Sequence, residues 1–243
     1  MIVDVVLLPD DLRLEHLSGR IVFVFDVLRA TTTMTSALAA GAKEIRTFDT
    51  LEAAETAAMA FDGRKLLCGE KHTLPPPGFD LGNSPGDYTP EKVGGKTIFF
   101  ATTNGTRAIH AAMNNPGAKP IAVYAAALVN ASAAAAIALQ EKEDVTLLCS
   151  GSDGQYSGED LIGAGAVVHA LGEFTSNSDM TFLARAVFSA VRDDLPAALR
   201  QTYGGRNNLR VGLGKDIDFA ARLDVFQTVG KLTGDPATAR VAK

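Results

Sequence analysis

The chain has few of the residues that mark secreted, membrane-spanning or thiol-dependent proteins. Its 243 residues include two cysteines, Cys68 and Cys149, and no tryptophan. Each cysteine closes an apolar strand-like segment, as buried free thiols do in a reducing compartment, and neither has the arginine six positions later that a cysteine phosphatase loop needs. No apolar run approaches the roughly 20 residues that span a bilayer, and no signal sequence is apparent. We therefore expect a cytoplasmic protein with no membrane segment.

The chain also lacks the charge pattern of a nucleic-acid-binding protein. Its net charge is −5, and its lysines and arginines form no cluster. The four histidines show no zinc-ligand spacing, and neither G-x-x-x-x-G-K-[ST] nor a G-x-G-x-x-G after a strand is present. A small anion would have to be held by a local pocket rather than by an overall basic field.

Apolar segments of strand length alternate with alanine-rich helical segments as far as residue 171. The expected strands are 2–8, 21–25, 44–48, 65–67, 96–100, 121–124 and 145–149. The expected helices are 33–40, 51–60, 108–113, 132–141 and 161–171, followed by a helical tail at 182–191, 195–203 and 219–225. This alternation predicts a three-layer α/β/α fold with a largely parallel or mixed sheet and a helical C-terminal cover.

The length suits one α/β domain over residues 1–243. Residues 21–45 and 97–121 both run through a strand, a threonine-rich turn with an arginine, a helix and Gly-Ala-Lys-x-Ile. This weak repeat leaves open two related subdomains, about 1–95 and 96–243, around one cleft, and equally leaves open a chance similarity. We expect the irregular passage 69–94 to be an ordered loop over the strand ends.

The buried strand 21–25 leads directly into a cluster of polar residues. Asp26, Arg29 and Thr31–Thr33 stand between this strand and a helix, where open α/β sheets bind ligands. The arginine, the hydroxyls and the helix start suit an oxyanion, whereas the carboxylate repels one. A divalent cation between them removes the conflict. The alternative is that Asp26 and Thr31 only cap the helix and that Arg29 pairs with Asp26.

Two further strand ends carry similar chemistry. The segment Thr103-Asn104-Gly105-Thr106-Arg107 can direct backbone N–H groups, hydroxyls and a guanidinium at one anion, or it can simply cap a helix. Glu159 and Asp160 follow a glycine- and serine-rich turn at a helix start. They suit a hard cation, and they equally suit the helix dipole alone.

Five motifs, in order along the chain, resemble the 2-phosphosulfolactate phosphatase family. They are Asp26-Val27-Leu28-Arg29-Ala30-Thr31-Thr32-Thr33, Gly69-Glu70, Gly78-Phe79-Asp80-Leu81-Gly82-Asn83-Ser84-Pro85, Thr102-Thr103-Asn104-Gly105-Thr106, and Ser157-Gly158-Glu159-Asp160 with Ala164-Gly165-Ala166. The resemblance implies a magnesium-dependent enzyme that releases phosphate from 2-phosphosulfolactate, a step towards coenzyme M. It also implies an α/β/α fold unrelated to the common phosphatase superfamilies.

The resemblance and the residue chemistry together give a set of expected site residues. We expect Mg²⁺ to be held by Asp26 with Glu70, Glu159 and Asp160, with Asp26, Arg29 and Glu159 taking part in catalysis. The expected substrate-binding residues are Arg29, Thr31, Thr32, Thr33, Asn83, Ser84, Thr103, Asn104, Gly105, Thr106 and Arg107. Leu28 stands where Asp-x-Asp phosphatases have a second acid, which favours a water held by the metal over Asp26 as the nucleophile.

The expected partner is a small anion that carries a phosphate monoester and a sulfonate, with neither nucleic acid nor membrane involved. Two alternatives remain: a phosphatase of the same fold that acts on another small phosphorylated acid, and a non-catalytic protein that binds sulfonate or phosphate. A homodimer is also left open.

Overall fold

All six residues of strand β2 (Arg20–Phe25) are buried, as its run of five apolar residues predicts. Ile21, Phe23 and Phe25 face one hydrophobic core, whereas Val22 and Val24 face a second core on the other side of the strand. Because successive side chains of a strand point to opposite faces, β2 must lie inside a sheet that is covered on both sides.

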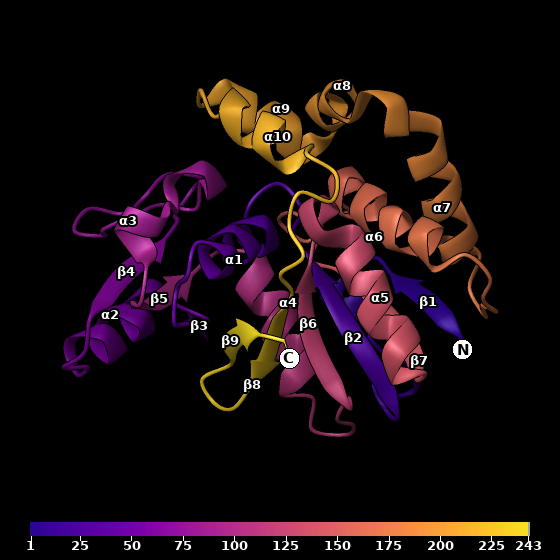
Figure 1. The fold of residues 1–243 in the computed structure, drawn as a ribbon, viewed down its shortest axis with the longest axis horizontal. Helices are drawn as coiled ribbons and strands as arrows, with labels where there is room; N and C mark the ends of the chain where they lie inside the picture. Colours follow the sequence, from indigo (N-terminus) through magenta and orange to yellow (C-terminus); the bar gives the residue numbers. More distant parts are fainter. Residues whose placement is uncertain (243) are drawn as a thin grey trace.

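The computed structural model describes residues 1–242 and contains, in that range, a nine-stranded mixed sheet of order β1-β7-β2-β6-β8-β9-β3-β5-β4. The other strands are β1 (Val3–Val6), β3 (Glu44–Phe48), β4 (Lys65–Gly69), β5 (Thr97–Ala101), β6 (Ala122–Ala126), β7 (Asp144–Cys149), β8 (Gly230–Thr233) and β9 (Thr238–Val241). Strands β1, β7, β2 and β6 form one parallel group, and β3, β5 and β4 form another. The antiparallel hairpin β8–β9 lies between β6 and β3 and joins the two groups (Figure 1).

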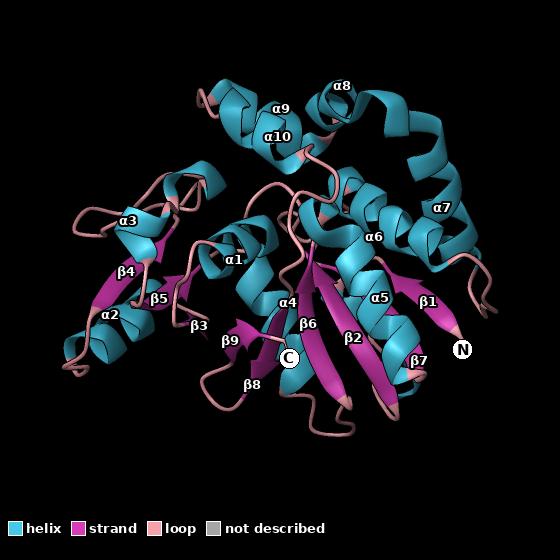
Figure 2. Cartoon of the chain, viewed as in Figure 1, coloured by secondary structure: helices cyan, strands magenta, loops and turns pink. Residues whose placement is uncertain are grey.

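Helices cover both faces of the sheet, which confirms the predicted three-layer α/β/α fold (Figure 2). One face carries α1 (Ala30–Ala39), α3 (Pro90–Val93) and α4 (Gly105–Met113), and the other carries α5 (Ala131–Glu141), α6 (Gly158–Leu171) and α7 (Asp179–Val191). Helix α2 (Leu51–Met59) packs on β4 and β5. Beyond α7 the chain forms α8 (Leu195–Gln201), α9 (Tyr203–Arg210) and α10 (Gly214–Ala220), which lie above the sheet in Figure 1.

The C-terminal part of the chain differs most from its sequence-based prediction. The predicted helix 195–203 is two helices, because Thr202 is extended and its Oγ1 accepts a hydrogen bond from the Gly205 N–H, starting a new helix. The predicted helix 219–225 is wrong, since α10 ends at Ala220. The hairpin β8–β9 was not predicted, because strands of four residues that pair with a distant part of the chain leave little local signal.

Cys68 and Cys149 are buried free thiols, as predicted. In the described part of the chain, no helix is long and apolar enough to cross a membrane. The division into two related subdomains stays a prediction.

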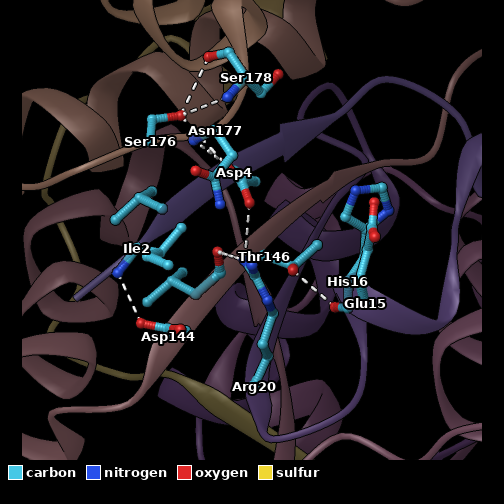
Figure 3. Close-up of polar contacts among 12 residues, drawn as sticks. Ile2, Asp4, Glu15, His16, Arg20, Asp144, Thr146, Ser176, Asn177 and Ser178 are labelled. Atoms are coloured by element: carbon cyan, nitrogen blue, oxygen red, sulfur yellow. Dashed lines mark hydrogen bonds and ion pairs between the residues drawn. The ribbon is translucent and has the colours of Figure 1, made fainter.

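A buried polar network ties the edge strand β1 to the rest of the molecule (Figure 3). Asp4 Oδ2 pairs with Arg20 Nη1 at 3.0 Å, and Asp4 Oδ1 accepts hydrogen bonds from Ser176 Oγ (3.1 Å) and the Asn177 N–H (3.0 Å). Thr175 O accepts a hydrogen bond from the Val3 N–H. Segment 175–177 therefore covers an edge that would otherwise be free to pair with another strand.

A second ionic cluster holds the hairpin against β3. Glu44 accepts hydrogen bonds from Arg46 Nε (2.8 Å) and from Arg240 Nε on β9 (3.0 Å). Burial alone would raise the pKa of Glu44, but the hydrogen bonds and charges of the two guanidinium groups outweigh it, so the pKa of Glu44 is lowered. The carboxylate form is thus the one that stabilises the junction between the two parallel groups.

Glu44→Gln should therefore lower the free energy of unfolding at pH 7, by about 1–2 kcal/mol, since Arg240 is half exposed. A depressed folded-state pKa contributes stability above the unfolded value of about 4.5, and this contribution disappears as the pH falls through the folded-state pKa. Urea unfolding of both proteins at pH 7 and below pH 4 should show the difference shrinking at acid pH. A difference that does not depend on pH would contradict this account.

Candidate active site

The turn after β2 is organised by Asp26 and Thr31. Thr31 Oγ1 accepts a hydrogen bond from the Asp26 N–H and donates one to Asp26 O, both at 3.0 Å. Asp26 Oδ1 accepts a hydrogen bond from the Ala30 N–H at 3.2 Å, at the first residue of α1. The capping role considered from the sequence is therefore present, but it uses one carboxylate oxygen. Among residues 1–242, Oδ2 has no hydrogen-bond donor.

Burial raises the pKa of Asp26 to about 6, and the charges of Glu70 and Glu159 add to this rise. The Ala30 N–H and the Arg29 guanidinium act in the opposite direction without cancelling it. Asp26 is thus a carboxylate whose charge is poorly compensated by its surroundings. A bound cation would supply the missing compensation.

Asp160 and Glu159, at the start of α6, differ in how their oxygens are used. Asp160 accepts hydrogen bonds from the Val27 N–H (2.8 Å) and the Gly151 N–H (3.1 Å), so it ties the turn after β2 to the turn after β7. Burial, followed by the charges of Asp26 and Glu159, raises the pKa of Asp160 well above its usual range. Glu159 is 3% exposed, and its Oε2 has no hydrogen-bond partner within the described chain.

Glu70, which follows β4, connects three separate segments. Its Oε2 lies 3.3 Å from Arg29 Nη2 and accepts a hydrogen bond from the Thr73 N–H at 2.8 Å. Its Oε1 accepts hydrogen bonds from the Thr103 N–H (2.8 Å) and Thr103 Oγ1 (2.7 Å). Both oxygens are therefore occupied, and Glu70 holds Arg29 and the turn after β5 in place.

The start of α4 approaches Asp26 so closely that only glycine fits there. A Cβ on Gly105 would lie 2.5 Å from Ala30 Cβ and 2.8 Å from Asp26 Oδ2. The first turn of α4 and its backbone N–H groups are thus brought beside the carboxylate. The ends of β2 and β5 meet here even though their strands belong to different parallel groups.

These elements surround a cavity of about 350 Å³. Seven of the residues predicted from the sequence line it: Asp26, Arg29, Glu70, Asn83, Thr103, Asn104 and Glu159. The lining residues that were not predicted as site residues are Leu28, His72, Thr73, Ser152, Asp153, Gly204, Asn207, Asn208, Arg210 and Val211. Half of that second group belongs to α9 or follows it directly.

The other predicted site residues do not line the cavity. Thr31, Thr32 and Thr33 are buried, and their hydroxyls donate to the backbone carbonyls of Asp26, Val27 and Asn83. Thr106 Oγ1 likewise donates to Thr102 O. Ser84 donates to Asp216 on α10, and Arg107 is exposed and pairs with Asp10 at 2.7 Å. Gly105 and Asp160 lie just behind the lining, where they contact Asp26 and the turn after β2.

The loop 69–94 forms one wall of the cavity and is pinned as its apolar residues predict. Tyr88 is buried and donates a hydrogen bond to Gly82 O, and Leu81 O accepts one from the Gly69 N–H. Asn83 projects into the cavity, where its Oδ1 is buried without a hydrogen-bond partner among residues 1–242. The predicted ordered loop is confirmed.

The residues of α9 were missed because the sequence Tyr203-Gly204-Gly205-Arg206-Asn207-Asn208 has low helix propensity and no apolar stripe. The spacing of Gly204, Asn207 and Asn208 could have revealed them, since residues three and four apart share one face of a helix. A helix whose inward face is small and polar packs poorly in a hydrophobic core. Such a helix is therefore a candidate for the lining of a ligand-binding cavity.

The arrangement is compatible with a single hard cation. Across the described residues, no three His, Cys, Asp or Glu side chains are grouped as a metal site. However, Asp26 Oδ2 and Glu159 Oε2 are carboxylate oxygens without donors, whereas the oxygens of Glu70 and Asp160 are occupied. Mg²⁺ is usually bound by one or two carboxylates together with waters and substrate phosphate. Asp26 and Glu159 fit that pattern.

Gly204→Ala should destabilise the protein by about 1–3 kcal/mol, because its Cβ would lie 2.0 Å from Glu159 Oε1 and 3.0 Å from Leu28 Cδ1. Gly214→Ala on α10 is a matched control, since its nearest neighbour would be at 3.5 Å. Urea unfolding measures both variants, and adding Glu159→Ala to Gly204→Ala should recover part of the loss. A Gly204→Ala protein as stable as the wild type would contradict the close approach of α9 to Glu159.

Comparisons with known proteins identify the family of the chain. The 2-phosphosulpholactate phosphatase family matches residues 6–235. A probable 2-phosphosulfolactate phosphatase of Synechococcus sp. (strain RCC307) is 40% identical over 94% of this chain and 93% of its own length. One from Thermotoga petrophila is 36% identical over 95% of both chains. The chain belongs to the 2-phosphosulfolactate phosphatase family.

Proposed function

We propose that the protein hydrolyses 2-phosphosulfolactate to sulfolactate and inorganic phosphate, with Mg²⁺ as its cofactor. The observation that carries this proposal is the pair of donor-free carboxylate oxygens, on Asp26 and Glu159, inside a cavity that also holds Arg29 and the start of α4. Membership of the family and the names of the relatives support the choice of substrate.

Asp26 and Glu159 are the proposed direct ligands of Mg²⁺, and Glu70 and Asp160 are positioning residues. When bound, the cation would neutralise charge on the phosphate oxygens and polarise the phosphorus atom. Asp160 fixes the backbone of Val27, next to Asp26, through a 2.8 Å hydrogen bond. Glu70 holds Arg29 through an ion pair and Thr103 through a hydrogen bond from its N–H.

Arg29, Thr103 and Asn104 are the proposed phosphate-binding residues, because they line the cavity beside Asp26. A guanidinium pairs with two phosphate oxygens at once, and the backbone N–H groups at the start of α4 favour negative charge. In hydrolysis a water oxygen forms the new bond to phosphorus, the ester P–O bond breaks, and the alkoxide leaving group takes up a proton. Attack by water rather than by Asp26 stays a prediction.

Several finer expectations also stay predictions: the sulfonate on the substrate, a place on the route to coenzyme M, the cytoplasmic location and a homodimer. The two alternative functions make different predictions in one assay. A phosphatase for another small phosphorylated acid would release phosphate faster from a different member of a panel of three-carbon phosphate esters. A non-catalytic binding protein would release none with any ester, even with Mg²⁺ added.

Asp26→Asn should reduce Mg²⁺-dependent phosphate release from 2-phosphosulfolactate by about 10³-fold or more, because it removes the charge that holds the cation while preserving the hydrogen bond from Ala30. Glu159→Gln should act in the same direction, and wild-type activity should vanish with EDTA and return with Mg²⁺.

The control is Asp193→Asn, an exposed acid on the outside of the molecule, which should leave the rate unchanged. Circular dichroism should show that each variant is folded. Full turnover by Asp26→Asn, or by the wild type in excess EDTA, would refute the proposed cation site.

A further inference from the structure

Helix α9 turns one small and polar face towards the cavity. Gly204, Asn207, Asn208 and Val211 lie three and four positions apart, as residues on one face of a helix do, and all four line the cavity. Arg210 lines it as well. Glycine and asparagine are poor helix formers, so this face lowers the intrinsic stability of α9. A structural role alone would favour apolar residues there.

Asn208 is a buried polar side chain without a protein partner. It is 4% exposed, and its Nδ2 has no hydrogen-bond acceptor in the part of the chain that the structure describes. A buried donor left unpaired destabilises the folded protein, because it loses its hydrogen bonds to water. Because Asn208 lines the cavity, an acceptor oxygen on a bound ligand can remove that cost.

Arg210 differs from the other guanidinium in the cavity in its ion pairing. Arg29 lies 3.3 Å from Glu70 and donates to Thr73 O at 2.6 Å, so its charge is partly compensated within the protein. Arg210 donates to Asn207 Oδ1 at 3.2 Å and forms no ion pair with a carboxylate of residues 1–242. Its charge is therefore left for an anionic ligand, in a cavity whose lining also includes Asp26, Glu70, Asp153 and Glu159.

The position of α9 relative to the acids is fixed by two close approaches. A Cβ on Gly204 would lie 2.0 Å from Glu159 Oε1, and one on Gly205 would lie 1.8 Å from Leu199 O. Both glycines let the helix backbone pack directly on these atoms. Asn208, one turn beyond Gly204, is thereby held in the lining of the cavity that also includes Asp26 and Glu159.

We propose that Asn208 and Arg210 form a subsite for the acid group on the leaving group of the substrate, separate from the proposed phosphate-binding residues Arg29, Thr103 and Asn104. The ligand chemistry is an oxyanion, carboxylate or sulfonate, close to the ester carbon. The Arg210 guanidinium pairs with two oxygens of this carboxylate or sulfonate. The Asn208 amide donates a hydrogen bond to one of those oxygens or, in a sulfonate, to the third oxygen. The inference rests on the proposed phosphatase activity, and it adds how the ester is oriented.

Arg210→Gln is the variant that tests this subsite. Its KM for 2-phosphosulfolactate should rise by about 10- to 100-fold, the loss expected for charge-assisted hydrogen bonds. Its activity on p-nitrophenyl phosphate, whose leaving group carries no acid, should stay within about twofold of the wild type, because the phosphate-binding residues are untouched. Titration calorimetry should show sulfolactate binding weakened by the same factor and inorganic phosphate binding unchanged.

Arg206→Gln is the matched control, since Arg206 is an exposed arginine on the same helix that does not line the cavity. It should change none of these quantities. The subsite would be overturned if Arg210→Gln lost equal activity on 2-phosphosulfolactate and on p-nitrophenyl phosphate, or lost activity on neither. Asn208→Leu should repeat the KM effect, and a failure of sulfolactate binding to respond to either variant would also overturn it.

Two further esters identify the acid group: phospholactate, which lacks the sulfonate, and the phosphate ester of 2-hydroxyethanesulfonate, which lacks the carboxylate. If the KM increase in Arg210→Gln is confined to one of these two esters, the result supports the subsite. It also shows that α9 binds the acid group which that ester carries. The subsite and the enzyme proposal can fail separately. Wild-type turnover with an unaffected Arg210→Gln refutes the subsite alone, whereas sulfolactate binding that depends on Arg210 without any wild-type turnover refutes the enzyme alone.

Discussion

The structure depends on the crowding of buried carboxylates at the end of β2. Burial and the charges of Glu70 and Glu159 raise the pKa of Asp26, and burial and the charges of Asp26 and Glu159 raise the pKa of Asp160. The fold provides hydrogen-bond donors for both oxygens of two neighbouring acids: two backbone N–H groups for Asp160, and Arg29, Thr73 and Thr103 for Glu70. Within residues 1–242, one oxygen of Asp26 and one of Glu159 have no such donor. Such an arrangement costs stability in the folded protein, and the proposed cation would offset that cost.

Segments far apart in the sequence must be held together for these acids to meet. The hairpin β8–β9 joins the strand group that carries Asp26 to the group that carries Glu70 and Thr103. Helix α10 is tied to the loop 69–94 through Asp216, which accepts a hydrogen bond from Ser84 at 2.8 Å. Asp224 ties the following segment to the start of α5 through Ser132. Residues 195–242 are therefore part of the walls and the frame of the cavity, and not only an outer cover.

Local sequence was sufficient to predict those parts of the candidate site that follow the end of a strand or begin a helix. The strand 21–25, the turns at Asp26 and Asn104 and the helix start at Glu159 were all recognisable from apolar runs followed by polar groups. Local sequence was insufficient where tertiary contacts decide. It could not show that Arg107 pairs with Asp10, that the hydroxyls of Thr31–Thr33 are used by the backbone, or that β8 and β9 enter the sheet. The local sequence also did not predict that α9 lines the cavity, because the side of α9 that faces the cavity is too polar to give a helical hydrophobic pattern.

The two interpretations weighed for Asp26, helix cap and metal ligand, are not exclusive, because a carboxylate has two oxygens. Oδ1 accepts the Ala30 N–H and fixes the rotamer, which leaves Oδ2 at a defined position beside Gly105. The two arginines of the cavity lining differ in a similar way. Arg29 forms an ion pair with Glu70, which orients it and compensates part of its charge, whereas Arg210 pairs with no carboxylate of residues 1–242. At the proposed site, a chain of net charge −5 would hold a small polyanion with charged groups that neighbouring residues position.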